Sequence, residues 1–197
     1  MLSLIFASHN SHKLAEAHNI LPKNINIVSL KDLDYHDEIE ETGSTFAENA
    51  LIKAKAIALH FNKITIADDS GLEVDYLNGA PGVYSARYAG KDSSSLALCT
   101  KLIQELAGIA TDKRTCRFVT NLALVDPLKK LEVVFEGTVD GVITEKMLGT
   151  NGFGYDPVFY YPPLAKSMAE MSSAEKNAIS HRYKALLKLR DYLGEVV

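Results

Sequence analysis

Residues 45–71, TFAENALIKAKAIALHFNKITIADDSG, join a helix signal to a strand signal. Thr45 and Glu48 have the spacing of a capping box, which marks the start of a helix. The apolar side chains that follow recur at helical spacing: Phe46, Ala50, Ala54, Ile57 and Phe61. Residues 64–67 are a compact apolar run that leads into the polar residues 68–71. We therefore predict a helix, then a buried strand, then a polar loop.

Working outward from this segment, the chain alternates strands with helices early and pairs two strands late. The other expected elements are strands at residues 2–7, 26–30, 115–125, 131–138 and 157–161 and helices at 14–21, 94–106 and most of the last thirty residues. The two middle strands form a hairpin around residues 127–130. This order predicts an α/β fold with a mixed sheet. No internal repeat divides the chain, so we expect one domain over residues 1–197.

Composition excludes several classes of protein. Lys and Arg total 21 against 25 Asp and Glu, and this net charge of −4 argues against a protein held to nucleic acid by its overall charge. The chain contains no apolar run long enough for a membrane helix and no basic leader, so we predict no membrane association and a cytoplasmic location. Cys99 and Cys116 lie in apolar stretches and are expected to be reduced, buried thiols.

Two adjacent carboxylates, Asp68 and Asp69, follow the predicted strand of residues 64–67. Ligands of α/β proteins bind at the carboxyl ends of strands, and paired carboxylates there suit a hard cation such as Mg²⁺. An ordinary turn is the alternative, because Asp, Ser and Gly are all turn residues.

A second polar loop, Ser8-His9-Asn10-Ser11-His12-Lys13, also follows a strand and opens a helix. Backbone N–H groups at such a helix start, together with Lys13, make a candidate anion site. Ordinary capping of the helix by Asn10 or Ser11 is the alternative.

A third polar cluster, in residues 172–182, brings Lys176, His181 and Arg182 together in sequence. On one unbroken helix Lys176 and Arg182 would point about 120° apart, which is typical of a solvated face. A shared site would require long side chains reaching around the helix, or a helix break near Ser180.

The motifs together resemble one family, the inosine triphosphate pyrophosphatases, which are also described as XTP/dITP diphosphatases. The matching blocks occur in family order and span essentially the whole chain: Ser8-x-Asn10-x-x-Lys13, residues 40–50 (EETGSTFAENA), 67–72 (ADDSGL), 79–88 (GAPGVYSARY), 152–157 (GFGYDP), 175–176 (EK) and 180–182 (SHR). The resemblance implies an elongated two-lobed fold around a long central mixed sheet with flanking helices, a nucleotide cleft between the lobes, and a homodimer.

The same resemblance implies Mg²⁺-dependent hydrolysis of a purine nucleoside triphosphate (ITP, dITP or XTP) to the monophosphate and pyrophosphate. Asp69 would be the general base and, with Glu40, a metal ligand; Asp68 would assist. Implied substrate contacts are Ser8, His9, Asn10, Ser11, His12, Lys13, Lys53, Ser70, Phe153, Gly154, Tyr155, Asp156, Lys176, His181 and Arg182. In this scheme Phe153 stacks on the purine, and His181 and Arg182 donate to its 6-keto oxygen.

Two other functions compete with this one. The chain could be a Mg²⁺-dependent phosphohydrolase of another nucleotide or phosphorylated metabolite, or a nucleotide-binding regulator without turnover. Glu40 and Asp69 argue against the regulator, because binding alone needs no poised base.

Overall fold

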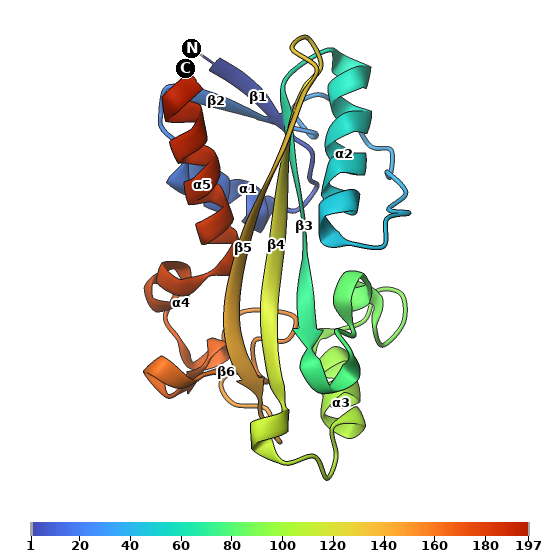
Figure 1. The fold of residues 1–197 in the computed structure, drawn as a ribbon, viewed down its shortest axis with the longest axis vertical. Coiled ribbons are helices and arrows are strands. Elements are labelled where there is room, and N and C mark those ends of the chain that lie inside the picture. Colours follow the sequence, from blue (N-terminus) through green and yellow to red (C-terminus); the bar gives the residue numbers. More distant parts are fainter. Residues whose placement is uncertain (1, 197) are drawn as a thin grey trace. The chain divides into compact units, whose positions relative to one another are not determined.

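The computed structural model describes residues 2–196, without the side chains of His12 and Val196 (Figure 1). The strands are β1 (Leu2–Phe6), β2 (Ile25–Ser29), β3 (Thr65–Val74), β4 (Thr115–Asp126), β5 (Leu131–Ile143), β6 (Phe159–Tyr161) and β7 (Lys166–Ser167). The α-helices are α1 (Ser11–Ile20), α2 (Phe46–Phe61), α3 (Ser95–Glu105), α4 (Ser173–Ile179) and α5 (His181–Val196). None of the helices within residues 2–196 is long and apolar enough to cross a membrane.

The described strands form one mixed sheet in the order β2-β1-β3-β4-β5-β6-β7. β1 pairs in parallel with β2 and with β3, whereas β6 pairs antiparallel with β5 and β7. The adjacent strands β4 and β5 are joined by residues 127–130 alone, a connection that permits only an antiparallel hairpin. The predicted α/β class and mixed sheet are confirmed.

The chain divides into two compact units. Unit 1 comprises Met1–Asp69, Thr120–Gly137 and His181–Val197, and unit 2 comprises Ser70–Val119 and Thr138–Ser180. Strands β3, β4 and β5 contribute residues to both units. The single domain over residues 1–197, the elongated shape and the cleft between lobes stay predictions.

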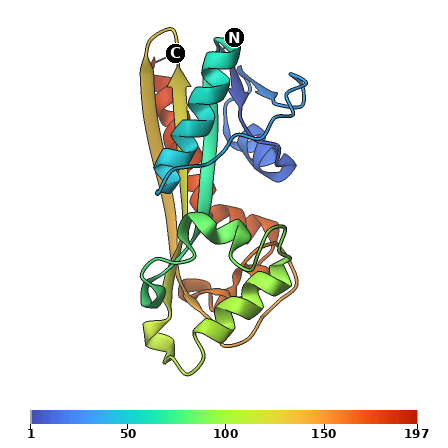
Figure 2. The same ribbon diagram turned by 90° about the vertical axis from the view of Figure 1, so that its right-hand side faces the viewer.

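Unit 1 has helices on both faces of its strands because successive strand residues point to opposite faces. Leu4 and Phe6 of β1 pack with α1 and α5, whereas Ile5 and Ala7 pack with α2. Figures 1 and 2 show α2 and α5 on opposite faces of these strands. Each face of the unit 1 strands thus has its own apolar layer.

Unit 2 has a single core. Leu98, Cys99 and Leu102 of α3 pack against Leu72 of β3 and Phe118 of β4. Cys99 and Cys116 are both free and buried, as the sequence predicts.

The prediction that β3 ends at residue 67 is wrong. The strand continues through Asp68-Asp69-Ser70-Gly71 to Val74, so these residues are not a loop or turn. Two carboxylates can lie inside a strand here because cations on neighbouring helices compensate them, and nothing near them in sequence announces those partners.

The C-terminal helical region is broken at Ser180, as a shared role for Lys176 and Arg182 would require. α4 ends at Ile179, Ser180 has extended backbone (φ −56°, ψ 135°), and α5 begins at His181. Lys176 belongs to unit 2 and Arg182 to unit 1. The alternative of one unbroken solvated helix is therefore wrong.

Candidate functional site

The two adjacent carboxylates of β3 point to opposite faces of the sheet. Their neighbours show the alternation: Ile66 belongs to the apolar layer under α1 and α5, and Ala67 to the layer under α2. Asp68 therefore faces α1 and α5, whereas Asp69 faces α2. This separation gives the two carboxylates different partners.

Asp68 is buried and paired with two cations. It is 1% exposed, and its Oδ2 lies 3.0 Å from Lys13 Nζ of α1 and 3.1 Å from Arg182 Nε of α5. Arg182 is itself buried, and its Nη1 donates to Glu16 Oε2 at 2.9 Å. Two carboxylates and two cations thus form a buried network between α1, α5 and β3.

Asp69 lies against α2. Asn49 Nδ2 donates to Asp69 Oδ2 at 3.1 Å, and Lys53 Nζ lies 3.8 Å from Asp69 Oδ1. Lys53 Nζ also donates to Glu41 Oε1 at 2.6 Å. Lys53 therefore lies between the carboxylate of β3 and the acidic segment of residues 37–41.

These environments move the pKa values of the two carboxyls in opposite directions. Burial raises the pKa of Asp69, and Lys53 opposes that rise. Burial would also raise the pKa of Asp68, but Lys13 and Arg182 outweigh it and hold that pKa well below its usual value. Lys13 and Arg182 thus favour the ionised form of Asp68, whereas burial disfavours the ionised form of Asp69.

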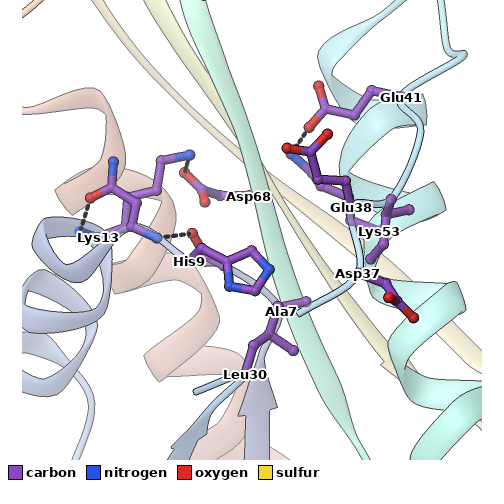
Figure 3. A pocket seen from close by; sticks show the side chains of 12 residues that line it. Ala7, His9, Lys13, Leu30, Asp37, Glu38, Glu41, Lys53 and Asp68 are labelled. Carbon is purple, nitrogen blue, oxygen red and sulfur yellow. Dashed lines mark hydrogen bonds and ion pairs between the residues drawn. The ribbon is translucent and has the colours of Figure 1, made fainter. Parts of the chain in front are cut away.

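A pocket of about 360 Å³ in unit 1 lies beside these groups (Figure 3). Its lining residues are Ala7, Ser8, His9, Asn10, Lys13, Leu30, Asp37, Glu38, Ile39, Glu41, Lys53 and Asp68. Figure 3 shows Lys13 and Asp68 on one side of the pocket and Glu38, Glu41 and Lys53 on the other. The predicted contacts Ser8, His9, Asn10, Lys13 and Lys53 therefore come together in one pocket.

The loop before α1 contains the capping hydrogen bond that was the alternative to an anion site, and the anion site itself stays a prediction. Asn10 Oδ1 accepts a hydrogen bond from Lys13 N at 3.3 Å, so Asn10 does cap the helix. Ser8 Oγ accepts from Asn10 N at 3.2 Å, which shapes the loop that follows β1. Ser11 is the first residue of α1, and the predicted contact of the His12 side chain lies outside the described residues.

The acidic segment places Glu41 rather than Glu40 on this pocket. Glu41 lines the pocket and pairs with Lys53, whereas Glu40 is exposed and does not line it. Among residues 2–196, no group of three or more His, Cys, Asp or Glu side chains is arranged to hold a metal ion. Oxygen donors are nevertheless the right chemistry for Mg²⁺, which takes one or two carboxylates and completes its shell with water and substrate phosphates.

In unit 2, the glycine-rich segment presents Phe153 on a braced loop. Asp156 is buried, and its Oδ2 accepts from Phe153 N at 2.7 Å and from Lys176 Nζ at 2.5 Å. Gly152 has a φ of +77°, and a side chain there would collide with Asp156. Phe153 is 53% exposed, and Lys176 Nζ lies 4.8 Å from the centroid of its ring.

The remaining predicted contacts of unit 2 are Gly154 and Tyr155, which follow Phe153 in the chain, and Ser70 of β3. Gly154 N donates to Ser95 Oγ at 2.7 Å, and the buried Tyr155 donates its hydroxyl to Ser85 O at 2.8 Å. Ser70 follows Asp69 in β3 and is half-buried. Unit 2 thus presents an exposed aromatic residue, Phe153, beside the Lys176 ammonium.

The sequence interpretation missed three residues that support these groups: Glu16, Asn49 and Ser95. Asn49 carried a signal, because it lies three residues after Phe46 on the face of α2 that the other spaced residues make apolar. A polar residue on an apolar helix face needs a partner inside the protein. Glu16 and Ser95 carried no such signal.

The protein is thus an α/β protein with a site suited to phosphate chemistry. The site combines Lys13 and Lys53 with two carboxylates of β3, Asp68 and Asp69. The model of the Ham1 family matches residues 4–192. A dITP/XTP pyrophosphatase of Bacillus licheniformis is 51% identical over 196 residues, 99% of this chain and 100% of the relative. A Listeria monocytogenes protein of the same name is 48% identical, covering 100% of this chain and 97% of the relative.

Solved structures agree with the sequence relatives. The Staphylococcus aureus Ham1 protein superposes with a TM-score of 0.93 at 42% identity, covering 99% of this chain and 100% of that chain. This chain belongs to the Ham1 family.

Proposed function

We propose that this protein hydrolyses non-standard purine nucleoside triphosphates (dITP, XTP and ITP) to the monophosphate and pyrophosphate. Relatives of about half-identical sequence over essentially the whole chain carry the name dITP/XTP pyrophosphatase. The observation that carries the proposal is the division of Asp68 and Asp69 between opposite faces of β3: Asp68 pairs with Lys13 and Arg182, whereas Asp69 lies against Asn49 and Lys53.

The phosphates are assigned to unit 1. Lys13 and Lys53 supply positive charge, and the first turn of α1 supplies backbone N–H groups near Ser8, His9, Asn10 and Ser11. Burial lowers the pKa of Lys13, whereas Asp68 favours its charged form. The buried network of Asp68, Arg182 and Glu16 thus fixes where the Lys13 ammonium lies.

Asp69 is assigned as the general base. A water molecule would transfer its proton to the Asp69 carboxylate while its oxygen bonds to the α-phosphorus. The bond from that phosphorus to the bridging oxygen breaks, and pyrophosphate leaves with the bonding electron pair. A base of raised pKa holds such a proton more readily than an ordinary aspartate does.

Mg²⁺ is assigned to Asp69 and Glu40, and when bound it supplies charge neutralisation on the phosphates. Glu41 is a second candidate because it lies against Lys53 on the pocket.

Chelation with EDTA should abolish pyrophosphate release, and added Mg²⁺ should restore it. Full activity in excess EDTA would remove the metal from the proposal. The Mg²⁺ concentration for half-maximal rate, compared between Glu40→Gln and Glu41→Gln, identifies which glutamate binds it.

The purine ring of the substrate is assigned to Phe153, which would stack on it. His181 and Arg182 are assigned as donors to the 6-keto oxygen of the purine. The loop that carries Phe153 would be fixed in place by Gly154, Tyr155, Asp156 and Lys176. Stacking is indifferent to the base and is worth about 1–3 kcal/mol. Phe153→Ala should therefore lower kcat/KM for ITP and XTP together by about 5–150-fold. Phe153→Tyr keeps the stacking face and is the matched control. A loss confined to one of the two nucleotides would contradict the stacking role.

A homodimer and a cytoplasmic location belong to the same proposal, supported by the family resemblance alone. Light scattering of the purified chain measures the mass in solution. A monomer at micromolar concentration would contradict the dimer.

The experiment that tests the function is product analysis with ITP, XTP, dITP, GTP and ATP in the presence of Mg²⁺. We expect the monophosphate and pyrophosphate, with the largest kcat/KM for the nucleotides lacking a 2-amino or 6-amino group. Release of inorganic phosphate would indicate a phosphohydrolase of another type. Binding without any product would indicate a regulator.

A further inference from the structure

Asn49 is a fully buried carboxamide on a face of α2 that is otherwise apolar. Asn49 is 0% exposed, and its neighbours Phe46 and Ala50 on α2 are buried apolar residues. A buried carboxamide is costly unless both its oxygen and its nitrogen are hydrogen-bonded. Its partners therefore show what it is for.

The two ends of the Asn49 side chain have different partners. Oδ1 accepts from Gly43 N at 2.8 Å, and Nδ2 donates to Asp69 Oδ2 at 3.1 Å. Gly43 N–H can only donate and an ionised carboxylate can only accept, so the orientation of the amide is fixed. The carboxamide joins the end of the acidic segment to the carboxylate of β3.

The chain before α2 is pressed against Asn49. A Cβ at position 43 would collide with Asn49 Oδ1 and with Glu48 Cβ, so glycine is needed there. Glu48 Oε2 also accepts from Ser44 N at 2.7 Å and from Thr45 N at 3.2 Å. The backbone that follows Glu40 and Glu41 is therefore anchored to the first turn of α2.

We propose that Asn49 is a positioning residue for hydrolysis: it holds Asp69 Oδ2 so that the Asp69 carboxylate keeps a fixed orientation toward the acidic segment of residues 37–41. This inference rests on the proposed function. Reacting groups must be held to within about 0.5 Å of their productive positions. Asn49 Nδ2 lies 3.1 Å from Asp69 Oδ2, closer than Lys53 Nζ, which lies 3.8 Å from Asp69 Oδ1. Asn49 acts through Asp69 and does not itself touch the nucleotide.

The test compares Asn49→Asp and Asn49→Ala with Ala58→Gly. Asn49→Asp keeps an acceptor for Gly43 but replaces the donor toward Asp69 with a carboxylate oxygen. Ala58→Gly lies on the same helix, is buried, and weakens α2 without touching the site. We expect Asn49→Ala to lose about 10–100-fold in kcat, as for the loss of a hydrogen bond to a charged group. Asn49→Asp should lose at least as much, because its carboxylate also repels that of Asp69. KM for ITP should change by less than about threefold, since the phosphate and base contacts are intact.

Nucleotide affinity measured by calorimetry in EDTA gives a readout without turnover, and it should match that of the wild type. A kcat for Asn49→Asp within about threefold of the wild type would overturn the inference. So would an equal loss of kcat in Ala58→Gly, because Asn49 would then only support the helix. A wild-type enzyme that releases no pyrophosphate would instead overturn the proposed function.

Discussion

Asp69→Asn should lower kcat for ITP by about 10²–10⁴-fold, the usual cost of losing a general base. The substitution keeps the shape of the side chain and an oxygen that can accept from Asn49 Nδ2. It removes the charge that takes the proton of water. Because burial already raises the pKa of Asp69, the fold loses little when this carboxylate becomes neutral.

Steady-state kinetics with ITP, together with a melting curve, measures this effect. Retention of more than about a tenth of the wild-type kcat would show that Asp69 is not the base. Asp68→Asn is the informative comparison, because Asp68 is buried with Lys13 and Arg182. We expect Asp68→Asn mainly to lower the melting temperature, whereas Asp69→Asn mainly lowers kcat.

Arg182→Ala should lower the free energy of unfolding by about 3–5 kcal/mol, as when one partner of a buried ion pair is removed. Arg182 contacts both Asp68 and Glu16, and its side chain is 6% exposed, so water cannot replace it. For a chain of this length the loss corresponds to a melting temperature lower by about 6–20 °C.

Arg190→Ala is the matched control for this prediction. It removes the same type of side chain from the same helix, but the Arg190 side chain is 42% exposed and pairs with the adjacent Asp191. Its effect should stay within about 0.5 kcal/mol. The double variant Asp68→Asn with Arg182→Ala should be more stable than the sum of the single losses predicts. Strict additivity would contradict the buried network.

The sequence predicts best those elements whose ends and apolar spacing are set by residues close together in the chain. The capping box of Thr45 and Glu48 forms, and α2 covers Phe46–Phe61, the span of its apolar spacing. Helix starts depend on hydrogen bonds between residues three apart, so the information is local.

β3 shows why other features could not be predicted. Asp, Ser and Gly favour turns, yet residues 68–71 continue the strand. The compensating cations lie on α1 and α5, and Arg182 is 114 residues away from Asp68 in sequence. The opposite orientation of Asp68 and Asp69 follows only once the strand is known to continue.

The same reasoning applies to the site. The motifs locate Lys13 and Phe153, the family resemblance adds Lys53, and the structure places the two lysines on one pocket. They do not locate Asn49 or Glu16, whose effects pass through Asp69 and Arg182. A residue that orients a functional group through a hydrogen bond can be recognised only from a structure that shows both partners.

The central claim, attack of an Asp69-activated water on the α-phosphorus, is tested most directly by turnover of ITP in water labelled with heavy oxygen. Mass spectrometry of both products then shows which one has received the label. Attack on the α-phosphorus places the heavy oxygen in the monophosphate and leaves the pyrophosphate unlabelled. Heavy oxygen in the pyrophosphate, or in released inorganic phosphate, would contradict the account.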